Sequence, residues 1–291
     1  MANLKELRIR INSVKTTKQI TSAMKMVAAA KLRKAQQAIL QLRPYAEKIH
    51  HLLESVVANA YDPIESDFFV ERPIKNVLLI AITSNRGLCG AFNSNVEKKI
   101  VSMVNEYKKD GISVENLKFI AYGKKGADAL NRRGYNLIEK NTEVFDNLTY
   151  EYATKISEDI KERYLNKEFD KVEIVYNSFK NAATQEIVKE QFLPLVQDDS
   201  NFSSTGDYLY EPDFEKVLEK LIPEALTMQI YKALLDSSAS EQGARMTAMH
   251  KATDNATELI HDLNLIYNKA RQAAITTEII EIVSGAEALK G

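Results

Sequence analysis

The sequence has little of what cross-links a chain or anchors it in a membrane. Among 291 residues there is one cysteine, Cys89, so no internal disulfide can form, as expected in a reducing compartment. No uninterrupted apolar run approaches the ~18 residues that a membrane-spanning helix needs, so we expect no such helix. The formal net charge is −1, which excludes a polyanion-binding role for the molecule as a whole.

The last third of the chain also lacks helix breakers. Residues 224–291 contain no proline, and their only glycines are Gly243, Gly285 and Gly291. A heptad repeat this long predicts a coiled-coil helix, about 90 Å long if Glu224–Ser284 is continuous. Two sets of apolar residues, each stepping by seven, form the predicted seam: Met249, Ala256, Leu263 and Ala270, with Ala252, Leu259, Ile266, Ala273 and Ile280.

A matching helical pattern runs from Leu4 to about Val57, after a capping-box pair at Asn3 and Glu6. Its seam consists of Leu7, Val14, Thr21, Ala28, Ala35 and Leu42, with Ile11, Met24, Leu32, Ala38 and Ile39 between. We infer that the two terminal helices pair antiparallel, because the intervening residues can then form one compact domain. Many seam residues are alanine, which buries little apolar area, so we expect the coil to need support from an outside partner.

The middle of the chain alternates strand and helix patterns. Strands are predicted at Val77–Thr83, Leu117–Gly123, Lys171–Phe179 and Glu186–Leu195, with helices at Ser94–Lys109, Lys125–Arg133 and Thr149–Leu165. This alternation predicts a mainly parallel sheet, so the fold class is α/β: a long antiparallel coiled coil plus a Rossmann-like domain. We assign residues 1–57 and 213–291 to the coil and 74–205 to the domain. Pro223 either kinks a short helix over residues 214–222 or lies in the first turn of the long one.

The sequence offers no convincing catalytic, cofactor or metal site. Gly87–Gly90 follows a strand and precedes a helix, where α/β folds bind phosphates, but it matches no phosphate-binding motif. We interpret it as a tight strand-to-helix turn. Cys89 has no evident base, and the four histidines lie on the long helices without metal-ligand spacing. The residues alone therefore indicate a mechanical or scaffolding protein.

Charge is unevenly distributed along the chain. Residues 1–43 carry ten Lys/Arg and one acid, Glu6. The pattern is typical of a solvated coiled-coil face or of a face that meets an acidic protein. A coiled coil that binds nucleic acid, and an enzyme with a nucleotide at Gly87–Gly90, are the alternatives from other classes.

Three segments resemble one family, the gamma subunit of the F-type ATP synthase. They are Ile20–Arg33, Ser240–Met249 and Asn268–Gly285, and the turn Arg86–Gly90 fits the same family. The resemblance covers the whole chain in order. It implies an antiparallel coil and a Rossmann-like domain that binds no nucleotide, forming a non-catalytic central rotor without a cofactor. The rotor couples proton flow through a membrane ring to ATP synthesis or hydrolysis in the hexamer of alpha and beta subunits.

The resemblance also implies contacts with the catalytic head. Met24 and Lys25 are expected to face an acidic loop of a beta subunit. Glu241 and Arg245 are expected to serve the same region from the other helix. The basic N-terminal helix agrees with an acidic partner.

Further implied contacts lie at the tip and at a foot. Gln272, Thr276 and Glu278 are expected in the upper bearing, and Tyr208 and Glu211 at the foot on the membrane c-ring. The epsilon subunit is a further implied partner, nucleic acid is not, and the implied location is the cytoplasmic face of the bacterial inner membrane, as a peripheral subunit. A single cysteine cannot form the thiol switch of the photosynthetic branch, which favours a non-photosynthetic bacterial enzyme.

Overall fold

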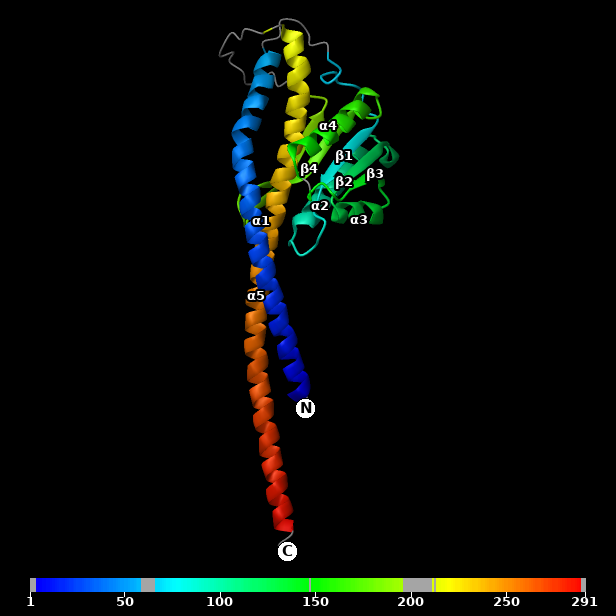
Figure 1. The fold of residues 1–291 in the computed structure, drawn as a ribbon. Helices are drawn as coiled ribbons and strands as arrows, with labels where there is room; N and C mark the ends of the chain where they lie inside the picture. The colour runs from blue at the N-terminus through cyan, green and yellow to red at the C-terminus, as the bar shows by residue number, and fades with distance from the viewer. Residues whose placement is uncertain (1–3, 59–65, 147, 196–210, 212, 289–291) are drawn as a thin grey trace. The chain divides into compact units, whose positions relative to one another are not determined.

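The computed structural model consists of two long terminal helices and a β-sheet with shorter helices packed on it (Figure 1). It describes residues 4–58, 66–146, 148–195, 211 and 213–288. By packing, the chain divides into two units. Met1–Ala28 with Met246–Gly291 form the first, called here the coil unit, and Ala29–Arg245 form the second, called the α/β unit. The predicted division into residues 1–57 with 213–291 and residues 74–205 stays a prediction.

Both long helices pass through a proline. Helix α1 spans Leu4–Ala58 and contains Pro44, and α5 spans Phe214–Ala288 and contains Pro223. The helix predicted at residues 214–222 is therefore the first part of α5. A proline removes one backbone hydrogen bond, but Ile222 and Leu226 on either side of it are buried in the sheet's core, which keeps the helix in place. The predicted cap residue Asn3 lies outside the described residues.

In the coil unit the two helices run antiparallel. Arg8 Nη2 donates to the Tyr267 hydroxyl at 2.9 Å, and the Thr253 hydroxyl donates to that of Thr21 at 2.8 Å. Rising residue numbers on α1 thus meet falling numbers on α5, which confirms the predicted direction of pairing. Leu7, Ile11 and Leu263 form a small buried cluster between them.

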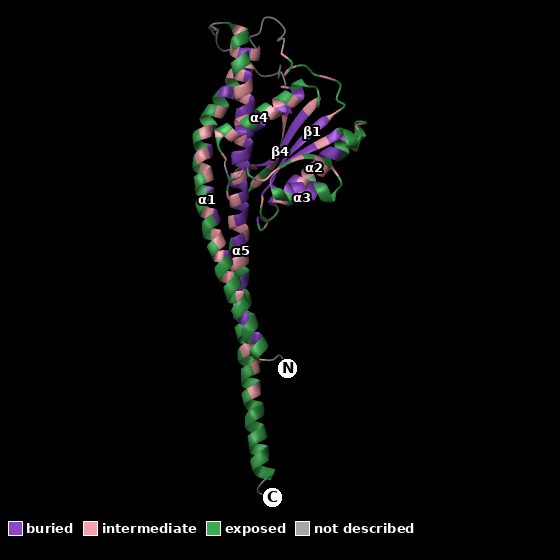
Figure 2. Ribbon diagram, turned by 45° about the vertical axis from the view of Figure 1, so that its right-hand side comes forward, coloured by how far each residue is buried: buried purple, intermediate pink, exposed green. Residues whose placement is uncertain are grey.

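One half of the predicted seam on α5 is not buried. Met249, Ala256 and Leu263 are buried as expected, whereas Leu259 and Ile266 are exposed, as are the later members of that second row, Ala273 and Ile280 (Figure 2). A single partner helix covers only one side of α5. The side chains of the second row are therefore free to contact either a partner outside the coil unit or solvent.

The α/β unit contains a sheet whose strand order is β3-β2-β1-β4-β5. Strands β1 to β4 are parallel to one another, and β5 runs antiparallel to β4. The strands are β1 Val77–Ile82, β2 Leu117–Tyr122, β3 Asn136–Asn141, β4 Lys171–Phe179 and β5 Gln185–Leu193. The other elements are α2 Phe92–Lys109, the 3-10 helix Val114–Asn116, α3 Lys124–Arg132 and α4 Tyr150–Leu165. The predicted strands are confirmed, but β3 was not predicted.

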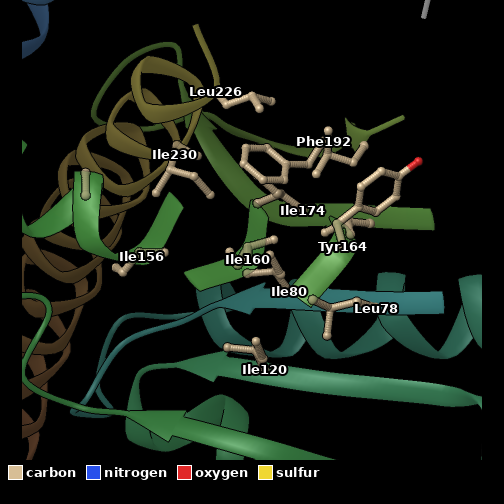
Figure 3. Close-up of a cluster of buried hydrophobic side chains, with 14 of the residues drawn as sticks. Leu78, Ile80, Ile120, Ile156, Ile160, Tyr164, Ile174, Phe192, Leu226 and Ile230 are labelled. Atoms are coloured by element: carbon tan, nitrogen blue, oxygen red, sulfur yellow. The ribbon is translucent and has the colours of Figure 1, made fainter. Parts of the chain in front are cut away.

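Two apolar layers cover the sheet. On one face, side chains of α4 and of α5, such as Ile160 and Ile230, pack on Ile80 and Ile174 (Figure 3). On the other face, α2 and α3 pack on the alternate strand residues, among them Leu79. Successive strand side chains point to opposite faces, so a strand covered on both sides must be apolar throughout. All six residues of β1 are buried, in agreement with its unbroken apolar run.

Candidate functional site

Met24 and Lys25 lie on α1 in the coil unit. Both are half-buried, and the next two residues, Met26 and Val27, are large, apolar and exposed, as is Ile20. An isolated two-helix coil has polar residues on its outer face. Apolar side chains next to Lys25 therefore indicate a surface that meets another protein.

Gln272, Thr276 and Glu278 are exposed near the end of α5. The Thr276 hydroxyl donates to the backbone carbonyl of Gln272, so it is occupied within its own helix. Every residue of 275–288 is exposed, and five large apolar side chains there are 47–70% exposed: Ile275, Ile279, Ile280, Ile282 and Val283. A contiguous exposed apolar surface is typical of an interaction site, so we expect a partner protein to cover this tip.

Glu241 and Arg245 are buried in the α/β unit, with exposed fractions of 8% and 9%. They lie one helical turn apart on α5 and form an ion pair through Arg245 Nη1. Arg245 Nη2 also donates to the backbone carbonyls of Arg86, at 3.1 Å, and Gly87, at 3.3 Å. Burial raises the pKa of the Glu241 carboxyl, while Arg245 acts in the opposite direction. The structure thus brings this predicted pair together, and binds it to the turn after β1.

The turn Arg86–Gly90 is held in a strained conformation. Leu88 has a φ of 64°, in the left-handed region that costs a residue with a side chain roughly 1–2 kcal/mol. Two residues on either side of the turn hold it: the Ser84 hydroxyl donates to the Arg86 carbonyl at 2.6 Å and accepts from Asn93 Nδ2 at 2.8 Å. A strained conformation of this kind persists where contacts with neighbouring residues stabilise it enough to offset its cost. Ser84 and Asn93 were missed from the sequence, although both flank the Gly87–Gly90 turn.

Cys89 is buried inside the same turn. Asn93 Nδ2 donates to its sulfur at 3.2 Å, and Ala244 of α5 packs against Cys89 and Phe92. Burial raises the pKa of the thiol. A nucleophilic cysteine needs the opposite shift, so the chemistry of Cys89 is that of a small packed side chain.

Small residues let α5 approach the β4–β5 hairpin closely. A Cβ added to Gly243 would lie 3.3 Å from the Cα and the carbonyl oxygen of Ala182. The buried Ser240 hydroxyl donates to the Asn177 carbonyl at 3.0 Å. Glycine is unfavourable inside a helix, and the sequence alone gives no reason for Gly243. The close approach of α5 to Ala182 explains why a residue without a side chain is found there.

The predicted foot is only partly described. Tyr208 lies outside the described residues, and Glu211 is exposed at a bend before α5. A different cluster, missed from the sequence, lies nearby in the chain: the hydroxyls of Tyr45 and Tyr150 both donate to Glu224 Oε1, at 3.1 and 2.7 Å. The Glu224 carboxylate, one residue after Pro223 on α5, is thus hydrogen-bonded to side chains of α1 and α4.

The described part of the chain holds no group of three or more His, Cys, Asp or Glu placed to bind a metal ion. Of the histidines, His250 lies 3.3 Å from the Asp254 carboxylate, and His261 lies 3.6 Å from that of Asp262. None of the helices there is long and apolar enough to cross a membrane.

Comparison with known proteins identifies the family. The sequence profile of the family described as ATP synthase matches residues 3–289. The ATP synthase gamma chain of Flavobacterium johnsoniae is 54% identical over 292 residues, which cover 100% of both chains. Two solved structures are also similar.

The first is the central stalk and c-ring of the Tetrahymena thermophila mitochondrial ATP synthase, with a TM-score of 0.57 and 25% identity over 80% of this chain and 99% of that one. The second is the rotor of the Euglena gracilis enzyme, with a TM-score of 0.67 and 22% identity over 94% and 98%. The alternative of a nucleic-acid-binding coiled coil receives no support from these matches. The chain belongs to the ATP synthase gamma chain family.

Proposed function

We propose that the chain is the central rotor of an F-type ATP synthase. It couples proton flow through the membrane ring to ATP synthesis or hydrolysis in the hexamer of alpha and beta subunits. The observation that carries this proposal is the 54% identity with an ATP synthase gamma chain over both full lengths. The similar solved structures are named as a central stalk with c-ring and as a rotor.

The exposed tip of α5 supports a place inside an enclosing partner. Ile279, Ile280 and Ile282 are exposed in the free chain. Helix α1 does not cover them, because the part of α5 that packs against α1 ends near Ala270. A ring of subunits around the helix removes this apolar surface from water. In this proposal Gln272, Thr276 and Glu278 lie in the bearing formed by that ring.

The head contacts are proposed on the coil near Lys25. Met24 and Lys25 meet an acidic loop of a beta subunit, and the exposed Met26 and Val27 add apolar area to the same surface. Glu241 and Arg245 serve the same region from α5, and they do so indirectly, because both side chains are buried and paired within the chain. In this proposal the chain is a non-catalytic subunit without a cofactor.

The foot and the location complete the proposal. Tyr208 and Glu211 contact the c-ring, and the epsilon subunit is a further partner. The chain is then a peripheral subunit on the cytoplasmic face of the bacterial inner membrane. Residues 1–57 and 213–291 act as the shaft, and residues 74–205 as the domain attached to it.

Affinity purification through a tag on this chain tests the function. We expect a ring of alternating nucleotide-binding subunits to co-purify. Vesicles with the reassembled enzyme are expected to pump protons on ATP addition only when the chain is present. Purification of the chain alone from membranes that contain an active enzyme, or pumping without it, contradicts the proposal.

A double change at the foot tests the ring contact separately. Tyr208→Ala with Glu211→Ala is expected to leave ATP hydrolysis near normal and to reduce ATP-driven pumping, because the shaft still turns in the head. Glu215→Ala, in the first turn of α5, is a matched control. Normal pumping in the double variant removes these two residues from the contact.

A further inference from the structure

Arg245 is the last residue of α5 that belongs to the α/β unit. Its guanidinium contacts three groups at once: the Glu241 carboxylate and the carbonyls of Arg86 and Gly87. A planar guanidinium with several fixed N–H donors suits this arrangement, whereas a lysine ammonium is a single point charge. The side chain therefore joins the turn after β1 to the helix at the end of the unit.

Burial of the pair argues against a purely external role. A group that meets a partner's acidic loop directly needs an accessible guanidinium, but the side chains of Arg245 and Glu241 are only 11% and 10% exposed and are bonded to each other within the chain. A buried ion pair is weak evidence for stability, since desolvation offsets much of its attraction. Its hydrogen bonds are directional, however, and here they fix one orientation between the helix and the turn.

We propose that Glu241 and Arg245 form an internal clamp that joins the Arg86–Gly90 turn to α5 and fixes the point at which the helix leaves the α/β unit. Both are positioning residues, which act through the turn. The mechanical consequence rests on the proposed rotor function: with the clamp closed, the domain and the helix turn as one body. With the clamp open, part of each rotational step is lost as local movement between the Arg86–Gly90 turn and α5.

The strained turn makes the clamp observable. Leu88 keeps its left-handed conformation, and Cys89 stays buried, while the surrounding groups hold the turn against α5. When the guanidinium is removed, the turn is expected to relax and expose Cys89. Burial raises the pKa of this thiol, whereas the Arg245 charge lowers it and the Glu241 charge raises it. Loss of the Arg245 charge alone therefore disfavours the thiolate, so a faster modification of Arg245→Ala reports exposure of Cys89 and not a change in the local charge.

Thiol modification of the isolated full chain tests the clamp, because Cys89 is the only cysteine in the sequence. With a maleimide, Arg245→Ala is expected to raise the modification rate at least tenfold, and Arg245→Lys and Glu241→Gln to give smaller increases. Arg163→Ala is the matched control, because it removes ion pairs with Glu139 and Asp159 elsewhere in the α/β unit. Its rate is expected to equal that of the wild type.

Urea separates local opening from general unfolding. A rate that stays constant at low urea concentration, with an unchanged circular dichroism spectrum, reports local release of the turn. If Arg245→Ala does not fold, the lysine and glutamine variants carry the test. Wild-type modification rates in all folded variants overturn the clamp, and leave the rotor function, tested by co-purification, untouched.

The assembled enzyme tests the mechanical consequence. Protons pumped per ATP hydrolysed are expected to fall across the variants in the order in which Cys89 becomes reactive, and Arg245→Lys is expected to recover part of the loss. A direct contact with an acidic loop predicts a different result: altered turnover and salt dependence with Cys89 still protected. That result, or unchanged pumping with a reactive Cys89, overturns the coupling role.

Discussion

The α/β unit and the coil unit bury their residues very differently. In the α/β unit, six consecutive residues of β1 are buried, and large side chains such as Phe119 and Tyr176 have almost no exposed surface. In the coil unit, the buried apolar residues are few and lie a helical turn or more apart along each helix, and the tip has none (Figure 2). The first unit holds itself together, whereas the second leaves apolar surface for a partner. Stability and partner contact are thus assigned to different parts of one chain.

The largest effect on stability is expected in the α/β unit. Phe119→Ala removes a fully buried ring stacked on Tyr135 and is expected to cost about 3–5 kcal/mol in the free energy of unfolding. Leu263→Ala, a smaller truncation in the coil unit, is expected to cost about 2 kcal/mol, at the low end for a buried leucine, because helices with solvent on most sides can close a small gap. Urea unfolding followed separately in the two units gives both values. Equal costs contradict the comparison.

A smaller effect is expected from the buried Asp236 in the α/β unit. Burial raises the pKa of this carboxyl, and Lys232 and Arg43 lower it in part, with Glu190 acting to raise it and a hydrogen bond from Ser178 to lower it. For an acid with a raised pKa, stability is present at low pH and is lost as pH rises through the folded-state pKa. Asp236→Asn is therefore expected to gain stability relative to the wild type as pH rises above the usual titration range of an Asp carboxyl.

Urea unfolding of both proteins at several pH values checks this expectation. Glu258→Gln, which replaces an exposed carboxyl of the coil unit, is the control. Parallel profiles for wild type and Asp236→Asn contradict the assignment of pH dependence to this buried group.

Changes at the tip are expected to have almost no effect on the free chain. Ile279→Ser with Ile282→Ser replaces two exposed side chains, so the free energy of unfolding is expected to stay within about 0.5 kcal/mol. Self-association of the free chain is expected to fall, because apolar surface is removed. The assembled enzyme is expected to lose ATP-driven pumping. Strong destabilisation of the free chain would show that the tip packs on its own.

The smallest effect on stability is expected at Lys25, which is half-buried on the coil. Lys25→Ala is expected to leave unfolding unchanged, but to alter turnover of the assembled head and make it less dependent on salt. Contacts between charges are screened over about 8 Å at physiological ionic strength, so removing one reduces the response to salt. Lys15→Ala, exposed on the same helix, is the control. An unchanged salt profile contradicts the contact.

Periodicity predicted most of the fold, because long helices and doubly covered strands carry strong patterns. Helix α1 ends within one residue of its predicted end, and the unbroken run of β1 marked it as a central strand. Strand β3 was missed because it lies at the sheet edge, where a polar sequence such as that of Asn136–Asn141 is tolerated. Pro223 gave no clear signal, since packing on both sides of it decides whether the helix continues.

The site was less predictable than the fold. Glu241 and Arg245 were recognised from the family pattern, but nothing in their spacing indicates that the guanidinium binds carbonyls some 158 positions earlier in the chain, at Gly87. Such a contact depends on how α5 is placed beside the turn after β1. The same holds for Glu224, whose partners Tyr45 and Tyr150 come from two other helices.

Amide hydrogen exchange on the free and assembled chain tests the contrast between the two units most directly. In the free chain, amides of Leu78–Ile80 and Ile174 are expected to exchange only through global unfolding, because they lie in the centre of a covered sheet. Amides of Ile275–Val283 are expected to exchange rapidly in the free chain and to become protected in the assembled head. Full protection of the tip without partners, or rapid exchange there inside the complex, contradicts the account.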